Sequence, residues 1–120
     1  LDNLTKTLWT GDLLFIGRIP ALDGSINGWL ATMQKLQSMD LNVVIPGHGI
    51  AGNKEWKKGL LDQIRYFTVL RTEIREIINN MGTIEEATQT VGLEETNKWE
   101  LFQLYHRRNI TASFVELEWE

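Results

Sequence analysis

A helical repeat of apolar residues in the second half of the chain constrains the fold more than any other feature. Across residues 53–80 the apolar side chains recur every three or four positions, which places them on one face of an α-helix. At about 1.5 Å per residue, this face is roughly 40 Å long. We therefore expect one long amphipathic helix whose apolar face packs against a core. That face consists of Trp56, Leu60, Ile64, Phe67, Leu70, Ile74, Ile77 and Met81.

Shorter helices are predicted on both sides of the long one. Asp23 or Ser25 can cap a helix that follows it, because a short polar side chain accepts hydrogen bonds from the first free amides. Thr83 and Glu86 form a capping box for another helix. The shorter helical segments are expected over residues 26–38, 84–91, 96–107 and 112–118.

Three short strands are expected in the first half, over residues 5–10, 13–16 and 41–45. Three strands make a poor sheet, and a sheet beside this much helix usually contains more strands. The sequence therefore predicts part of a layered α/β structure, with strands and loops over residues 5–50 and helices over 53–118. This order of elements does not predict a self-sufficient domain.

Composition excludes several classes of protein. The chain has 120 residues, a net charge of -4 and no cysteine. An acidic chain lacks the basic surface that general nucleic-acid binding or binding to anionic membranes requires. Disulfides, thiolate nucleophiles and cysteine-ligated metals are excluded. No apolar run approaches the ~20 residues of a membrane span.

Two metal-competent side chains follow or interrupt the predicted strands. Asp12 lies in TGDLLF (residues 10–15), and His48 lies in VIPGHG (residues 44–49). Ligands in α/β structures gather at strand ends, and the neighbouring glycines allow close approach to the backbone. From the residues alone, both segments are also ordinary turns, with Asp12 bonding backbone amides. His106 is expected on a helix surface or at a helix cap.

These two motifs, about thirty residues apart, resemble the second half of hydrolases with the metallo-β-lactamase fold. The resemblance implies the C-terminal half of a four-layer αββα fold, α/β (α+β) in class, and covers nearly the whole chain. It is closest to the quinoprotein relay system zinc metallohydrolases. The segments that carry this closer likeness are RIP (18–20), DGS (23–25), GWL (28–30), YH (105–106), NIT (109–111) and ELE (116–118).

The resemblance implies a dinuclear zinc site. Asp12 would bridge the two ions, because a carboxylate has an oxygen for each, and His48 would ligate the second ion. Metal-bound hydroxide would then attack an ester-, thioester- or amide-like bond of a small-molecule substrate. Arg18 is a candidate contact for a substrate anion, although an ordinary surface arginine fits the residue as well. The resemblance also favours a bacterial, periplasmic setting.

The histidine-rich half of such a site is missing from this sequence. The His-x-His-x-Asp-His motif is absent, and the chain contains two histidines in total. A catalytic zinc ion needs about three protein ligands, so we expect this chain alone to be inactive. It would require an N-terminal half that carries the histidine motif, and its uncovered strands favour a homo-oligomer or a domain swap. The alternatives are a non-catalytic interaction module or a scaffold of the same fold.

Overall fold

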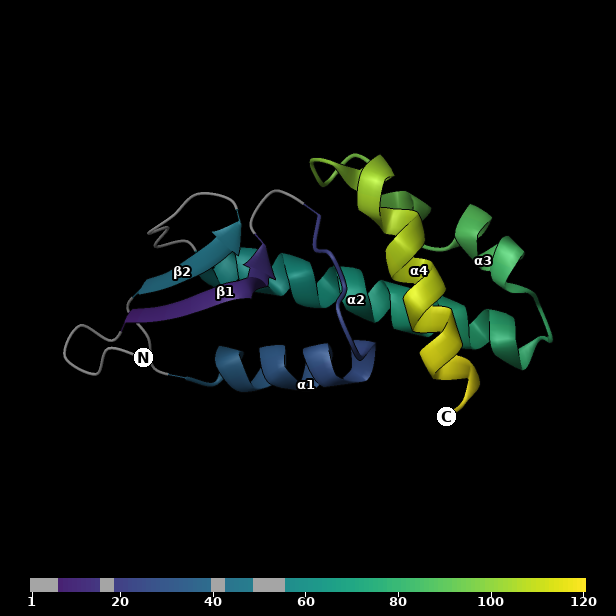
Figure 1. Ribbon diagram of the computed structural model, residues 1–120, viewed down its shortest axis with the longest axis horizontal. Coiled ribbons are helices and arrows are strands. Elements are labelled where there is room, and N and C mark those ends of the chain that lie inside the picture. Colours follow the sequence, from purple (N-terminus) through teal and green to yellow (C-terminus); the bar gives the residue numbers. More distant parts are fainter. Residues whose placement is uncertain (1–6, 16–18, 40–42, 49–55) are drawn as a thin grey trace.

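The structure, a computed structural model, describes residues 7–15, 19–39, 43–48 and 56–120. Helix α2 runs through the middle of the molecule, α1 lies beside its first half, and α4 crosses its second half near α3 (Figure 1). Within these ranges no helix is long and apolar enough to cross a membrane. The elements are β1 (Thr7–Phe15), α1 (Ile26–Gln37), β2 (Val43–His48), α2 (Trp56–Asn79), α3 (Ile84–Thr90), the short 3-10 helix η1 (Leu93–Glu95) and α4 (Phe102–Glu118).

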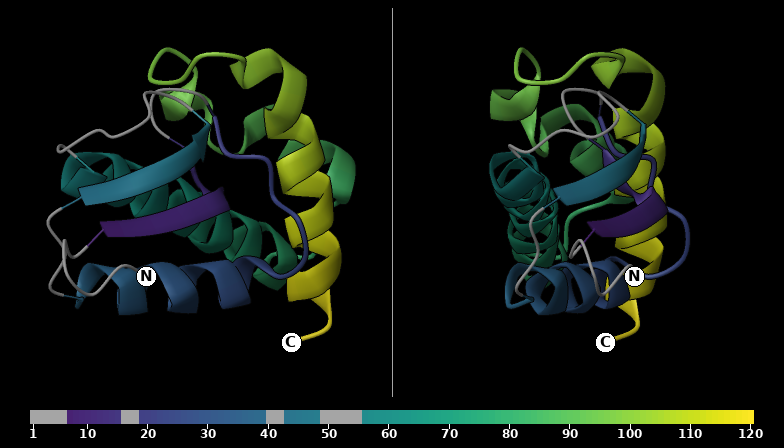
Figure 2. Two further views of the ribbon diagram at one scale, coloured as in Figure 1. Left: turned by 60° about the vertical axis from the view of Figure 1, so that its left-hand side comes forward. Right: turned by 90° about the vertical axis from the view of Figure 1, so that its left-hand side faces the viewer.

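The prediction of an α/β fold, as the C-terminal half of a four-layer αββα structure, is wrong. The compact part of the described chain is a globule of four helices, whose apolar faces pack on one another. Strands β1 and β2 pair with each other and form a two-stranded ribbon beside α2, visible from two further sides in Figure 2. Two strands do not make a sheet layer, since a layer needs more strands to cover a helical face.

The predicted helix starts are confirmed where capping residues mark them. The Ser25 hydroxyl accepts a hydrogen bond from the Gly28 amide at 2.9 Å, and α1 begins at the next residue. The Thr83 hydroxyl accepts from the Glu86 amide at 3.2 Å, and α3 follows. Local side-chain chemistry therefore determines both helix starts.

The apolar face of the long helix is also confirmed, except at its end. The residues from Trp56 to Ile74 that carry the repeat are buried, apart from the partly buried Ile64. Met81 is 92% exposed, because α2 ends at Asn79 and Met81 adopts a positive φ of 61°. The apolar repeat in the sequence thus continues two residues beyond the end of α2.

Two predicted boundaries are wrong. The Gly11–Asp12 interruption does not divide the first strand, since β1 is continuous from Thr7 to Phe15. The predicted break near residues 109–111 is absent, and α4 is one helix of 17 residues. Thr111 stays helical by donating its hydroxyl to the Arg107 carbonyl at 2.9 Å, the i−4 bond that threonine makes inside helices.

Candidate functional site

The two predicted metal ligands lie on paired strands. Asp12 is within β1, and His48 is the last residue of β2. The strands are parallel, and the Cα atom of His48 pairs with that of Phe15 at the end of β1. Both motifs therefore lie toward the same, carboxyl-terminal edge of the ribbon, where α/β structures usually bind ligands.

The strand pairing is irregular where Asp12 lies. Gly11 is paired with Pro46 and Phe15 with His48, so β1 advances four residues while β2 advances two. Extra residues of this kind form bulges, which are frequent next to functional sites because they redirect side chains.

A buried glutamine connects this edge to the helices. The Gln63 side chain, 0% exposed, accepts a hydrogen bond from the Phe15 amide at 2.8 Å. Its amide nitrogen contacts the Met33 sulfur at 2.9 Å. Phe15 also stacks on Trp29 at a ring separation of 6.5 Å. Helices α1 and α2 therefore hold Phe15 in place at the end of β1. Phe15 is the residue of β1 that pairs with His48.

The ligand set fits part of a zinc site. A carboxylate and an imidazole are both ordinary zinc ligands, but a catalytic ion needs about three. The described part of the chain contains no cluster of three or more acidic or histidine residues suited to a metal ion. Arg18, the predicted substrate contact, lies outside the described residues. Asp12 and His48 are therefore two residues of types that zinc accepts, fewer than a catalytic ion needs.

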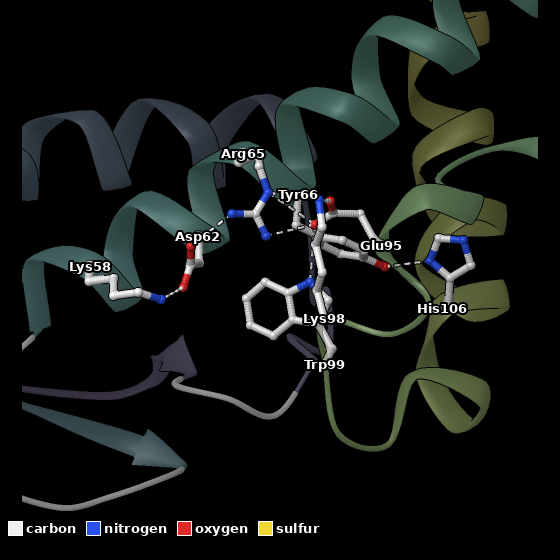
Figure 3. Close-up of polar contacts among 8 residues, drawn as sticks. All are labelled: Lys58, Asp62, Arg65, Tyr66, Glu95, Lys98, Trp99 and His106. Atoms are coloured by element: carbon white, nitrogen blue, oxygen red, sulfur yellow. Dashed lines mark hydrogen bonds and ion pairs between the residues drawn. The ribbon is translucent and has the colours of Figure 1, made fainter.

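Sequence reasoning missed a buried carboxylate at Glu95, shown in Figure 3. Its side chain is 2% exposed and is paired with Arg65 at 3.0 Å and Lys98 at 3.2 Å. It also accepts a hydrogen bond from the Trp99 indole at 3.1 Å. Burial alone would raise the pKa of Glu95, but the hydrogen bonds from these partners outweigh it and lower that pKa. This cluster ties η1 to α2.

The prediction that His106 lies on a helix surface or at a cap is wrong. The residue is inside α4 and is 6% exposed, with its ring stacked on Phe102 at 4.0 Å. Its two ring nitrogens lie 2.8 Å from the Tyr66 hydroxyl and 2.8 Å from the Val91 carbonyl. One signal was available before the structure, since His106 is four residues after the apolar Phe102 and therefore on the same helical face.

No protein-family model matches this sequence, and no curated protein matches it. The candidate site therefore depends on the two motifs and on the pairing of the strands that carry them.

Proposed function

We propose that this chain is part of a zinc-dependent hydrolase and contributes Asp12 and His48 to its metal site. The observation that carries the proposal is the parallel pairing of β1 with β2, which brings two motifs far apart in sequence to one edge. The irregular register at Asp12 and the anchoring of Phe15 by Gln63 add support, because both belong to that edge. The resemblance of the motifs to metallo-β-lactamase-type hydrolases supplies the reaction class.

The two side chains have complementary roles in this proposal. Asp12 offers two carboxylate oxygens and can serve two cations, whereas the neutral imidazole of His48 serves one. When bound, zinc ions activate water and polarise the carbonyl of an ester-, thioester- or amide-like substrate. Both residues hold the ions in position, and neither needs to act as a nucleophile.

The remaining ligands must come from another segment. We propose a histidine-rich segment, carried by a separate polypeptide or by the rest of a longer one, that meets this chain at the carboxyl-terminal edge of β1 and β2. The chain alone then binds zinc weakly and does not turn over substrate, because two ligands leave the ion largely hydrated.

Equilibrium dialysis of the chain against zinc tests the metal assignment. We expect weak binding that Asp12→Ala and His48→Ala each weaken by about tenfold or more, since even indirect partners of a metal contribute 10–100-fold to affinity. Asp23→Ala is the matched control and should bind as the unmodified chain does. Tight stoichiometric zinc that survives both substitutions would show that the site is elsewhere.

A further inference from the structure

A short segment before α1, residues 20–22, is held against α4 by one side chain. The Asn109 amide oxygen accepts a hydrogen bond from the Leu22 amide at 2.8 Å. The Asn109 amide nitrogen donates to the Pro20 carbonyl at 2.7 Å. Asn109 is 2% exposed, so water does not readily replace these bonds. We call residues 20–22 the strap.

The same asparagine belongs to a buried chain of hydrogen bonds whose directions are fixed. The Val91 carbonyl can only accept, so Nε2 of His106 carries the hydrogen and Nδ1 has a free lone pair. The Tyr66 hydroxyl must therefore donate to Nδ1 across 2.8 Å. The Tyr66 oxygen in turn accepts from the Asn109 amide nitrogen at 3.1 Å. Each donor in this chain thus has its acceptor.

Protonation of His106 reverses one of these bonds. With a hydrogen on Nδ1, the ring and the Tyr66 hydroxyl both present donors to each other. The tyrosine oxygen can accept from the ring, but its own hydrogen then needs a new acceptor, and Tyr66 is 0% exposed. A buried donor without an acceptor is costly. The Asn109 amide can supply that acceptor by turning over, so that its oxygen faces the Tyr66 hydroxyl, and this turn removes both of its hydrogen bonds to the strap.

We propose that His106 is a proton-sensitive latch, which holds the strap through Tyr66 and Asn109 when neutral and releases it when protonated. The release is local. Ile19, directly before the strap, keeps its own bond, since its amide donates to the Glu100 backbone carbonyl at 2.9 Å.

The surroundings of His106 favour the neutral ring. Helix α2 presents Tyr66, the end of α3 presents the Val91 carbonyl, and the strap carries no ionisable residue. Burial lowers the pKa of His106, opposed by the Val91 hydrogen bond and by the charge of Glu95 in η1. Glu95 is already engaged by Arg65 and Lys98, so it does not pair with the imidazolium.

Nuclear magnetic resonance of the chain without metal tests the latch directly. The ring nitrogens of His106 report the tautomer and its titration, and hydrogen exchange reports the protection factors of Leu22 and Ile19. We expect Nε2–H at neutral pH and a fall in Leu22 protection over the pH range in which the His106 ring takes up its second proton. Ile19 protection should stay unchanged.

Two variants sharpen the test. His106→Gln cannot titrate, so the pH-dependent loss of Leu22 protection should disappear. Tyr66→Phe removes the hydroxyl that connects the ring to Asn109, so protonation of His106 should no longer affect Leu22 protection. A ring that titrates in the unmodified chain while Leu22 protection stays constant would overturn the latch, as would hydrogen on Nδ1 at neutral pH.

Discussion

Replacing Glu95 with alanine should destabilise the protein substantially. The carboxylate is 2% exposed, and its loss leaves the indole N–H of Trp99, itself 8% exposed, without its acceptor. An unsatisfied buried donor costs about 1–3 kcal/mol. Arg65 and Lys98 are 39% and 50% exposed, so each lost ion pair adds only about 0–1 kcal/mol after screening by water.

Together these losses amount to about 1–5 kcal/mol. For a chain of this length that lowers the melting temperature by about 4–20 °C, measured by calorimetry or circular dichroism. Glu94→Ala is the matched control, because Glu94 is exposed in the same 3-10 helix and should shift the melting temperature little. Equal melting temperatures for the two variants would refute the reasoning.

The carboxylate of Glu95 should also make the stability of the folded protein depend on pH. Since the pKa of Glu95 is lowered in the folded state, the unfolded chain binds a proton first as the pH falls. The contribution of Glu95 to stability is present above its ordinary pKa of 4.5 and is lost as the pH falls through the lowered value. Glu95→Ala should therefore reduce the acid sensitivity of the melting temperature below about pH 4.5.

Three further substitutions test the packing around the candidate site and the latch. Gln63→Leu removes the acceptor of the Phe15 amide, so the free energy of unfolding measured in urea should fall by about 1–3 kcal/mol. An unchanged urea midpoint would show that Gln63 does not anchor Phe15. Gly92→Ala should cost about 2–4 kcal/mol, because φ is 71° and the new Cβ would lie 2.7 Å from the His106 ring; a variant as stable as the original would contradict that contact. Ser113→Ala should raise stability by about 0.5–1 kcal/mol, since the buried hydroxyl has no hydrogen bond within the described residues, and a loss in thermal unfolding would reveal a partner.

Local patterns predicted the helices well because their causes are local. The Ser25 and Thr83 caps and the apolar repeat of α2 depend on residues three or four positions apart. The continuity of α4 was missed because Asn109 has low helix propensity, and its side chain is satisfied by the strap, which lies 87 residues earlier in the sequence.

The fold class and the buried polar residues depend on long-range contacts that one sequence does not display. Strand patterns at β1 and β2 suggested a layered sheet, but the helices cover one another and the strands form a two-stranded ribbon. His106 was expected on a helix surface or at a cap, since polar side chains are usually exposed, and no sequence pattern singled out Glu95. Their burial depends on partners in α2 and at the end of α3.

The most direct test of the central claim is hydrolysis by the protein assembled with its remaining metal ligands. Substrates are a panel of lactones, thioesters and lactams, and the variants are Asp12→Ala, His48→Ala and the double substitution, with Asp23→Ala as control. If Asp12 and His48 hold one metal site, each single substitution depresses turnover by orders of magnitude, and the double variant is little worse than Asp12→Ala. Asp23→Ala should keep its rate. Full activity with two bound zinc ions in Asp12→Ala would contradict the account.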